Sequence, residues 1–235
     1  RDLVLPMTTI PECHLPQSDG SKRSLTTGRA FRLNEPNIPT VAANPVRDRV
    51  QDQLRLVHYL DVEHSPRYQP QPPQTFCNIY ACDYCHLNGA YLPRVWWTPA
   101  AVKDISAGKT VPVRYGDTVL ELNANALYDW LLSYGPAFGW LVSNPEEIQI
   151  AANLGCVGVI CAAQKDPHRS GHISVVVPES DPPNAALRAG PITGLGSVVI
   201  PLQSQAGTRN HCFSCVEGPW WKSPAYRGFG FWTHI

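Results

Sequence analysis

The placement of prolines constrains this chain more than any other feature of its sequence. Twenty-three of the 235 residues are proline, and a proline inside a helix or a central strand removes a backbone hydrogen bond. Prolines recur through residues 1–44 and crowd into SPRYQPQPPQ, residues 65–74. Residues 1–44 are therefore predicted to be an irregular N-terminal extension, and residues 45–235 to hold the folded domain.

Two helices are predicted on either side of the second proline cluster. Over residues 45–61, apolar residues recur at helical spacing, and Asn44 precedes them as a suitable N-cap. Residues 77–87 contain neither proline nor glycine, and Gly89 follows them as a stop signal. This second stretch predicts a buried helix that begins at or near Cys77.

The rest of the chain predicts two more helices and then a series of strands. Residues 124–135 place apolar side chains on one face, and residues 145–154 begin with a proline and two glutamates at the positive helix end. Four β-branched or aromatic stretches bounded by turn residues indicate strands at 156–163, 172–178, 197–202 and 228–234. Helices followed by consecutive strands favour an α+β domain, with a central antiparallel sheet and helices packed to one side.

Composition argues against two classes of partner. Nineteen basic residues balance nineteen acidic ones, so the chain has no basic block to bind a nucleic-acid backbone. No stretch approaches the ~20 continuous apolar residues of a membrane-spanning helix. Eight cysteines favour an oxidising compartment. The sequence thus predicts a secreted or cell-envelope protein.

The cysteines allow two further interpretations. Cys82 and Cys85, and Cys212 and Cys215, form two CxxC pairs that resemble a zinc site, but 126 residues separate the pairs, against roughly 15–20 in a compact zinc ribbon. Disulfides are favoured over zinc and over buried free thiols. The cysteines considered for pairing are Cys13, Cys82, Cys85, Cys156, Cys161, Cys212 and Cys215.

A nucleophile and its base are suggested by one cysteine and one histidine. Cys77 follows the proline-rich loop at a predicted helix start, where the partial positive charge of the helix favours a thiolate. His172 follows Ser170 and Gly171 at a predicted strand start, so its ring could be held at one end of the sheet. Such a pair can attack an amide and protonate its leaving group. The alternative is a buried or disulfide-bonded cysteine and a capping histidine.

A third polar residue must orient the histidine ring. Gln203, Gln205 and Asn210 are all candidates, because the adjoining strand would bring them back to His172. The sequence alone does not decide which of the three orients the His172 ring.

The residues from Asn44 to the C-terminus resemble the papain-like cysteine amidases and peptidases of bacterial cell walls, near the CHAP and NlpC-type groups. The resemblance rests on SPRYQPQPPQTFCNIYACDYCHLNGAYLPRVWW, ELNANALYDWLLSYGPAFGW, SGHISVVVPE, LQSQAG and the final FGFWTH, in that order. It implies a papain-like fold with Cys77 as nucleophile, His172 as general base and Gln205 as the ring-orienting residue. Asn78 and Asp83 are then packing or hydrogen-bonding residues.

The resemblance also implies the chemistry. The backbone N–H of Cys77, with a side chain ahead of it such as Tyr68 or Gln74, could form an oxyanion hole. The implied activity is hydrolysis of amide bonds in peptidoglycan, in the stem peptide, in the cross-bridge or between muramic acid and L-Ala, with no metal or other cofactor. The alternative is a non-enzymatic papain-like module that binds the wall or serves in an assembly.

A third hypothesis is a disulfide-rich, aromatic carbohydrate-binding protein. The pairs Trp96–Trp97 and Trp220–Trp221 could stack on sugar rings, although paired tryptophans more often pack in the core. This hypothesis predicts exposed, coplanar tryptophans and no cleft at Cys77. Three polar residues on predicted helices and turns are interpreted as caps or turn formers: Asp129, Asp166 and His168.

Overall fold

A computed structural model describes residues 9–42, 45–180, 184–190 and 197–235 of the chain. Five α-helices lie in these residues: α1 (Val46–Leu60), α2 (Cys77–Leu87), α3 (Pro99–Ser106), α4 (Ala124–Ser133) and α5 (Pro145–Asn153). The first four strands are β1 (Val95–Trp97), β2 (Val119–Glu121), β3 (Trp140–Val142) and β4 (Val157–Gln164). The others are β5 (His172–Val176), β6 (Leu187–Ala189), β7 (Ser197–Ile200), β8 (Gln203–Gln205), β9 (His211–Ser214) and β10 (Tyr226–His234).

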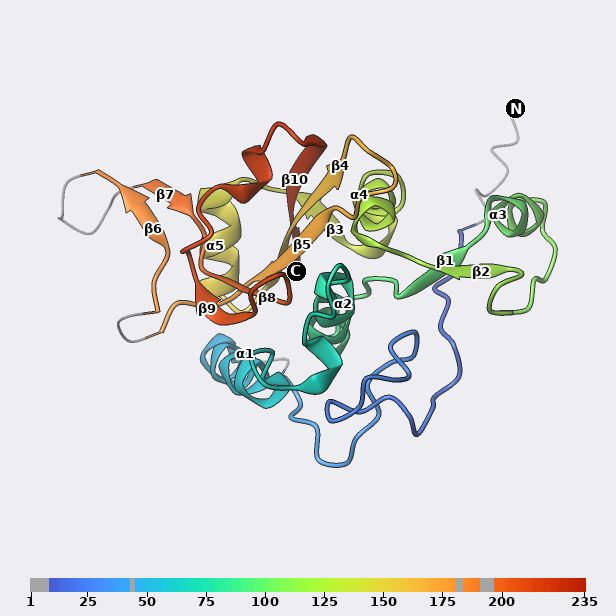
Figure 1. The fold of residues 1–235 in the computed structure, drawn as a ribbon, viewed down its shortest axis with the longest axis horizontal. Coiled ribbons are helices and arrows are strands. Elements are labelled where there is room, and N and C mark those ends of the chain that lie inside the picture. The colour runs from blue at the N-terminus through green and yellow to red at the C-terminus, as the bar shows by residue number, and fades with distance from the viewer. Residues whose placement is uncertain (1–8, 43–44, 181–183, 191–196) are drawn as a thin grey trace.

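The centre of the fold is a six-stranded sheet in the order β3-β10-β4-β5-β8-β9. All five pairings in it are antiparallel, as the α+β prediction requires. Two-stranded ribbons complete the fold, with β1–β2 beside α3 at one end of the molecule and β6–β7 at the other (Figure 1). The sheet places the starts of β5 and β10 and the end of β8 at neighbouring positions.

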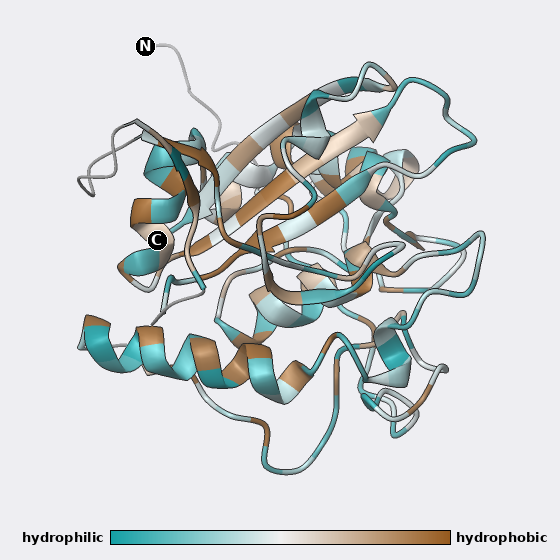
Figure 2. Ribbon diagram, turned by 60° about the vertical axis from the view of Figure 1, so that its left-hand side comes forward, coloured by the Kyte–Doolittle hydropathy of each residue, from teal (hydrophilic) through white to brown (hydrophobic). Residues whose placement is uncertain are grey.

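Helices cover both faces of the sheet, whereas the sequence predicted one covered face. Val159 and Cys161 of β4 pack into the core shared with α2 and α4, while Ile160 and Ala162 pack into a second core with Ile148 of α5. Successive side chains of a strand point to opposite faces. A strand as uniformly apolar as β4 therefore needs cover on both sides, and the hydropathy colouring shows it as a brown band inside the molecule (Figure 2).

The four predicted helices form within one or two residues of their expected bounds. Asn123 and Asn144 cap α4 and α5 by accepting hydrogen bonds from the N–H groups of Ala126 and Glu147, at 2.9 Å and 3.0 Å. The predicted cap of α1, Asn44, lies outside the described residues. The helix α3 and the strands β1, β2, β3, β6, β8 and β9 were not predicted, because most are three or four residues long and carry little periodic signal.

The described part of the N-terminal extension, residues 9–42, has no helix or strand but packs against the domain. Cys13, Leu15 and Leu33 are buried in the main core. The carbonyl oxygen of Pro11 accepts a hydrogen bond of 2.9 Å from the indole N–H of Trp97. Prolines here prevent regular pairing, so side-chain burial and isolated hydrogen bonds hold the segment.

The predicted disulfides are absent: all eight cysteines lie in the described residues, and each is a free thiol. Backbone carbonyl groups accept hydrogen bonds from several of these thiols. The Sγ atoms of Cys13, Cys82 and Cys161 donate to the carbonyl oxygens of Val95, Pro93 and Ala124, at 3.1, 3.5 and 3.4 Å. These contacts direct the thiols to separate parts of the core, so the cysteine count no longer favours an oxidising compartment.

No helix among the described residues is long and apolar enough to cross a membrane.

Candidate active site

The α2 helix begins where the proline-rich loop ends, and Cys77 is its first residue. The backbone groups of Gln71 and Gln74 pair with each other and turn the chain just before the helix. No side chain caps the start of α2. The first N–H groups of the helix are therefore available to a ligand, and the Cys77 sulfur lies at its positive end. Cys77 is 2% exposed.

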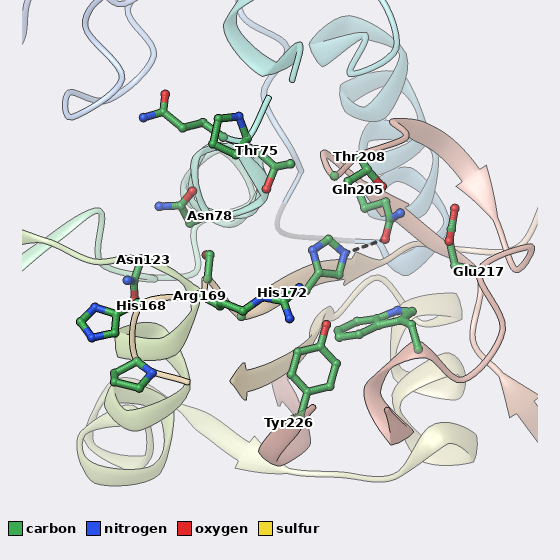
Figure 3. Close-up of a pocket in the computed structure, with 17 residues that line it drawn as sticks. Thr75, Asn78, Asn123, His168, Arg169, His172, Gln205, Thr208, Glu217 and Tyr226 are labelled. Carbon is green, nitrogen blue, oxygen red and sulfur yellow. Dashed lines mark hydrogen bonds between the residues drawn. The ribbon is translucent and has the colours of Figure 1, made fainter. Parts of the chain in front are cut away.

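His172 is the first residue of β5, and Gln205 is the last residue of the neighbouring β8. The Nε2 atom of His172 lies 2.8 Å from the Oε1 atom of Gln205 (Figure 3). Because a carbonyl oxygen only accepts hydrogen bonds, Nε2 carries the proton in this contact. The Nε2 amide group of Gln205 donates in turn to the carbonyl oxygen of Arg209 at 3.3 Å, which fixes the orientation of the amide.

The Cys77 thiol and the His172 ring are close enough for each to shift the pKa of the other. Since Gln205 occupies Nε2, the Nδ1 atom of the ring is the nitrogen that remains for the sulfur. The three sequence-predicted site residues therefore form one chain of contacts, from the α2 start through β5 to β8. The structure brings together all three.

The two reactive groups shift each other's pKa in opposite directions. Burial acts to raise the pKa of Cys77, but the hydrogen bond and positive charge of His172 outweigh it, so the pKa lies below its usual value. Burial acts to lower the pKa of His172, but the hydrogen bond and charge of Cys77, with smaller contributions from Gln205 and Glu217, raise it. These shifts favour a thiolate paired with an imidazolium.

Trp220 covers the histidine on one side. Its ring meets that of His172 edge to face, with centroids 4.6 Å apart. Its indole N–H donates a 2.9 Å hydrogen bond to the Oε1 atom of Gln203, which also accepts one from Ser174. Gln203, a candidate for the ring-orienting role, thus holds Trp220 and Ser174 instead.

The histidine opens into a cavity of about 860 Å³ between the start of α2 and the edge of the sheet (Figure 3). Its wall includes the loop before α2, the loop before β5, and the starts of β10 and of the 3-10 helix η3 (Trp220–Lys222). The polar and aromatic residues that line it are Gln74, Thr75, Asn78, Asn123, His168, Arg169, Ser170, His172, Gln205, Thr208, Glu217, Trp220 and Tyr226. A cavity of this size accommodates a short peptide segment beside the thiol.

Asn78 and Asp83 have structural contacts, consistent with their predicted packing roles. The Asn78 amide donates to the carbonyl oxygen of Leu122 at 2.8 Å. Asp83 accepts hydrogen bonds from the Arg67 guanidinium at 2.7 Å and from the Tyr68 hydroxyl at 3.0 Å, deep in the core. Tyr68 is therefore turned away from the cavity, and of the two proposed oxyanion side chains only Gln74 lies in its wall.

The other residues singled out from the sequence form hydrogen bonds and an ion pair that stabilise loops and the surface. Asn210 donates to the carbonyl oxygens of Val62 and Tyr68, at 2.8 Å and 3.0 Å. Asp129 pairs with Arg227 at 2.7 Å on the surface. Asp166 accepts the backbone N–H of His168 at 2.9 Å within a turn, although the His168 side chain also lines the cavity.

The tryptophans do not form a flat sugar-stacking surface. Trp96, Trp97 and Trp221 are buried, with 6%, 6% and 1% of their surface exposed. The rings of Trp220 and Trp221 stand at 81° to each other rather than coplanar. The expectations of the carbohydrate-binding hypothesis, coplanar exposed tryptophans and no cleft at Cys77, are therefore wrong.

The sequence reasoning missed several cavity residues, among them the charged or aromatic residues Arg169, Glu217 and Tyr226. Arg169 stands three residues before His172, in a turn that the sequence marked only as a boundary. Nothing in the local sequence separates any of the three from an ordinary surface residue. Among the described residues, no group of three or more His, Cys, Asp or Glu side chains is arranged to hold a metal ion.

Comparisons with known protein families, with curated proteins and with solved structures found no match to this chain.

Proposed function

We propose that this protein is a cysteine amidohydrolase with a papain-like fold that cleaves amide bonds of cell-wall peptidoglycan. The observation that carries the proposal is that Cys77 interacts with His172, which Gln205 holds at 2.8 Å, and that His172 and Gln205 line one cavity. A thiolate at a helix start, with a histidine oriented by a side-chain amide, is suited to nucleophilic attack on a carbonyl. The substrate class and action at the cell envelope rest on the sequence resemblance.

In the first half of the reaction, the Cys77 thiolate attacks the amide carbonyl carbon and forms a tetrahedral oxyanion. The backbone N–H of Cys77 at the open start of α2 is placed to stabilise that charge. The His172 imidazolium then gives its Nδ1 proton to the amide nitrogen, the C–N bond breaks, and the amine leaves. An acyl thioester on Cys77 remains.

In the second half, neutral His172 takes a proton from water, and the resulting hydroxide attacks the thioester. Collapse of this second intermediate releases a carboxylic acid and restores the ion pair. Gln205 accepts the Nε2–H of the ring throughout and keeps Nδ1 directed at the sulfur. Trp220 covers the ring and limits the access of water to it.

Digestion of purified peptidoglycan tests the proposal. We expect the wild-type protein to release new amine and carboxylate ends, identified by mass spectrometry of the products, and Cys77→Ala to release none. The matched control is Cys82→Ala, which removes a buried thiol five residues along the same helix and is expected to retain activity. Binding of intact peptidoglycan without any cleavage would refute the hydrolase and favour the non-enzymatic module.

A further inference from the structure

The loop between β4 and β5 is fastened to the domain and holds Arg169 in the cavity wall. The side-chain amide of Asn125 donates to the carbonyl oxygen of Arg169 and accepts from the N–H of Gln164, both at 2.8 Å. The N–H of Arg169 donates to the carbonyl oxygen of Asp166 at 3.1 Å and closes the turn. Gly171 packs so tightly that a Cβ atom there would lie 2.1 Å from the carbonyl oxygen of Ala162. The backbone that carries Arg169 is thus fixed.

The guanidinium of Arg169 has no ion-pair or hydrogen-bond partner among the described residues. Two other arginines are paired, since Arg227 contacts Asp129 at 2.7 Å and Arg188 contacts Glu179 at 2.6 Å. Arg169 instead extends into the cavity, toward the space between His172 and Tyr226 (Figure 3). Its five donors are therefore available to a ligand in the cavity.

Tyr226 presents a second free donor at the same place. Its ring is half-buried at the start of β10, and its hydroxyl points into the cavity without a hydrogen-bond partner among the described residues (Figure 3). Burial raises the pKa of Tyr226, and the Cys77 sulfur raises it further, while the Arg169 charge lowers it. The raised pKa keeps the hydroxyl protonated as a donor, and Tyr226 and Arg169 line the same cavity.

The opposite side of the cavity is acidic. Glu217 lies beyond Gln205 as seen from Arg169 (Figure 3). Its Oε1 atom is 3.2 Å from Nε2 of His211. An anionic group of a substrate would be repelled from Glu217 and attracted to Arg169. The charges of the cavity therefore favour one direction for an anionic substrate.

We propose that Arg169 and Tyr226 form a carboxylate-binding subsite, so that the preferred substrate carries a free carboxylate beside the amide bond that Cys77 attacks. A guanidinium binds a carboxylate through two parallel N–H bonds, and a phenol hydroxyl adds a third. Peptide stems with free side-chain or terminal carboxylates meet this requirement. The substrate assignment rests on the proposed hydrolase function, but the subsite itself can be tested without hydrolysis.

The first test compares two alkylating reagents of similar size, iodoacetate and iodoacetamide, which differ in a carboxylate. We measure the rate at which each modifies Cys77, by mass mapping of the intact wild-type protein and of Arg169→Gln. The ratio of the iodoacetate rate to the iodoacetamide rate is expected to fall about tenfold in Arg169→Gln, the loss typical of one charge-assisted contact. The iodoacetamide rate is expected to stay unchanged, because that reagent is neutral.

The control is Arg114→Gln, the same substitution at an exposed arginine that does not line the cavity. It is expected to keep the wild-type ratio. An unchanged ratio in Arg169→Gln, or an equal loss in Arg114→Gln, overturns the subsite.

The second test measures substrate choice. Carboxylates of purified peptidoglycan are converted to amides with a carbodiimide and ammonia, and cleavage of the two materials is compared. The wild type is expected to cleave the amidated material about tenfold less efficiently, and Arg169→Gln to show no such preference, with Tyr226→Phe in between. Equal cleavage of both materials by the wild type overturns the subsite, whereas no cleavage of either, with the alkylation ratio as expected, overturns only the hydrolase function.

Discussion

The α2 helix buries cysteine side chains both in its first turn and in the two turns that follow. The pKa values of these thiols are shifted in opposite directions. Cys77 and Cys82 are 2% and 4% exposed. The pKa of Cys77 lies below the usual value for a thiol, whereas burial raises the pKa of Cys82 to about 12. Burial also raises the pKa of Cys85, one turn later in the helix. Burial in one helix therefore does not decide whether a thiol is reactive.

The difference lies in what each group faces. Cys77 faces the ring of His172, which supplies a hydrogen bond and a positive charge. Cys82 donates to the carbonyl oxygen of Pro93, a contact that holds the proton on the sulfur. The charge in the middle of the helix belongs to Asp83, and the Arg67 guanidinium, which is 0% exposed, neutralises it at 2.7 Å. The start of the helix therefore has a thiol with a lowered pKa, whereas its middle has a buried ion pair and protonated thiols.

The largest effect is expected from replacing His172, the residue that lowers the pKa of the Cys77 thiol. At pH 6 the wild-type thiol is expected to react with iodoacetamide faster than an ordinary thiol, because His172 holds the pKa of Cys77 below its usual value of 9.0. In His172→Ala the hydrogen bond and positive charge of His172 are lost, so the pKa of Cys77 rises. The thiolate fraction at pH 6, and with it the labelling rate, is then expected to fall about 10²-fold. Mass mapping over a pH series measures both rates. Cys82 serves as the internal control and should remain unlabelled in both proteins.

The difference between the two parts of α2 would disappear if Cys82 reacted as fast as Cys77. It would also disappear if His172→Ala kept the wild-type rate at pH 6.

A smaller effect, on the free energy of unfolding, is expected from a substitution in the middle of α2. Asp83→Asn removes the charge that balances buried Arg67 and is expected to lower the free energy of unfolding by about 3 kcal/mol, measured by urea denaturation. The matched control is Asp104→Asn, which loses an exposed pair with Lys109 and should cost less than about 1 kcal/mol. Equal losses in the two variants would show that Asp83 has no special role in stability.

The smallest effect concerns the residue that orients the ring. Gln205 contributes to the raised pKa of His172, so the imidazolium is lost at lower pH when the amide is removed. Gln205→Ala is expected to lower peptide hydrolysis about tenfold and to move the alkaline limb of the pH–rate profile to lower pH. The wild-type profile falls below the lowered pKa of Cys77 and above the raised pKa of His172.

Gln205→Glu restores an acceptor and adds a negative charge, so its alkaline limb should move to higher pH than that of the wild type. An alkaline limb that is the same in both variants would mean that Gln205 does not act on the ring.

Local patterns allowed four of the five described α-helices and the long strands to be predicted. The absence of proline and glycine from residues 77–87 predicted α2 and its start at Cys77, because helix termination is a property of adjacent residues. The three-residue strands carried no such signal, and β8 has the polar sequence Gln-Ser-Gln. Its place in the sheet depends on pairing with β5 and β9, which are distant in the chain.

The sequence by itself determined where α2 begins, which histidine opens β5 and which two glutamines flank Ser204, because these depend on residues next to one another. Only the tertiary structure decided that Gln205 rather than Gln203 holds the His172 ring. Residues two apart in a strand share a face, so the register of β8 against β5, and the irregular pairing of β8 with β9, decide which of the two meets the ring. The tertiary structure also decided that the cysteines remain separate thiols and that Arg169 and Tyr226 line the same cavity as His172. Contacts between groups far apart in the chain arise from packing, which no local pattern encodes.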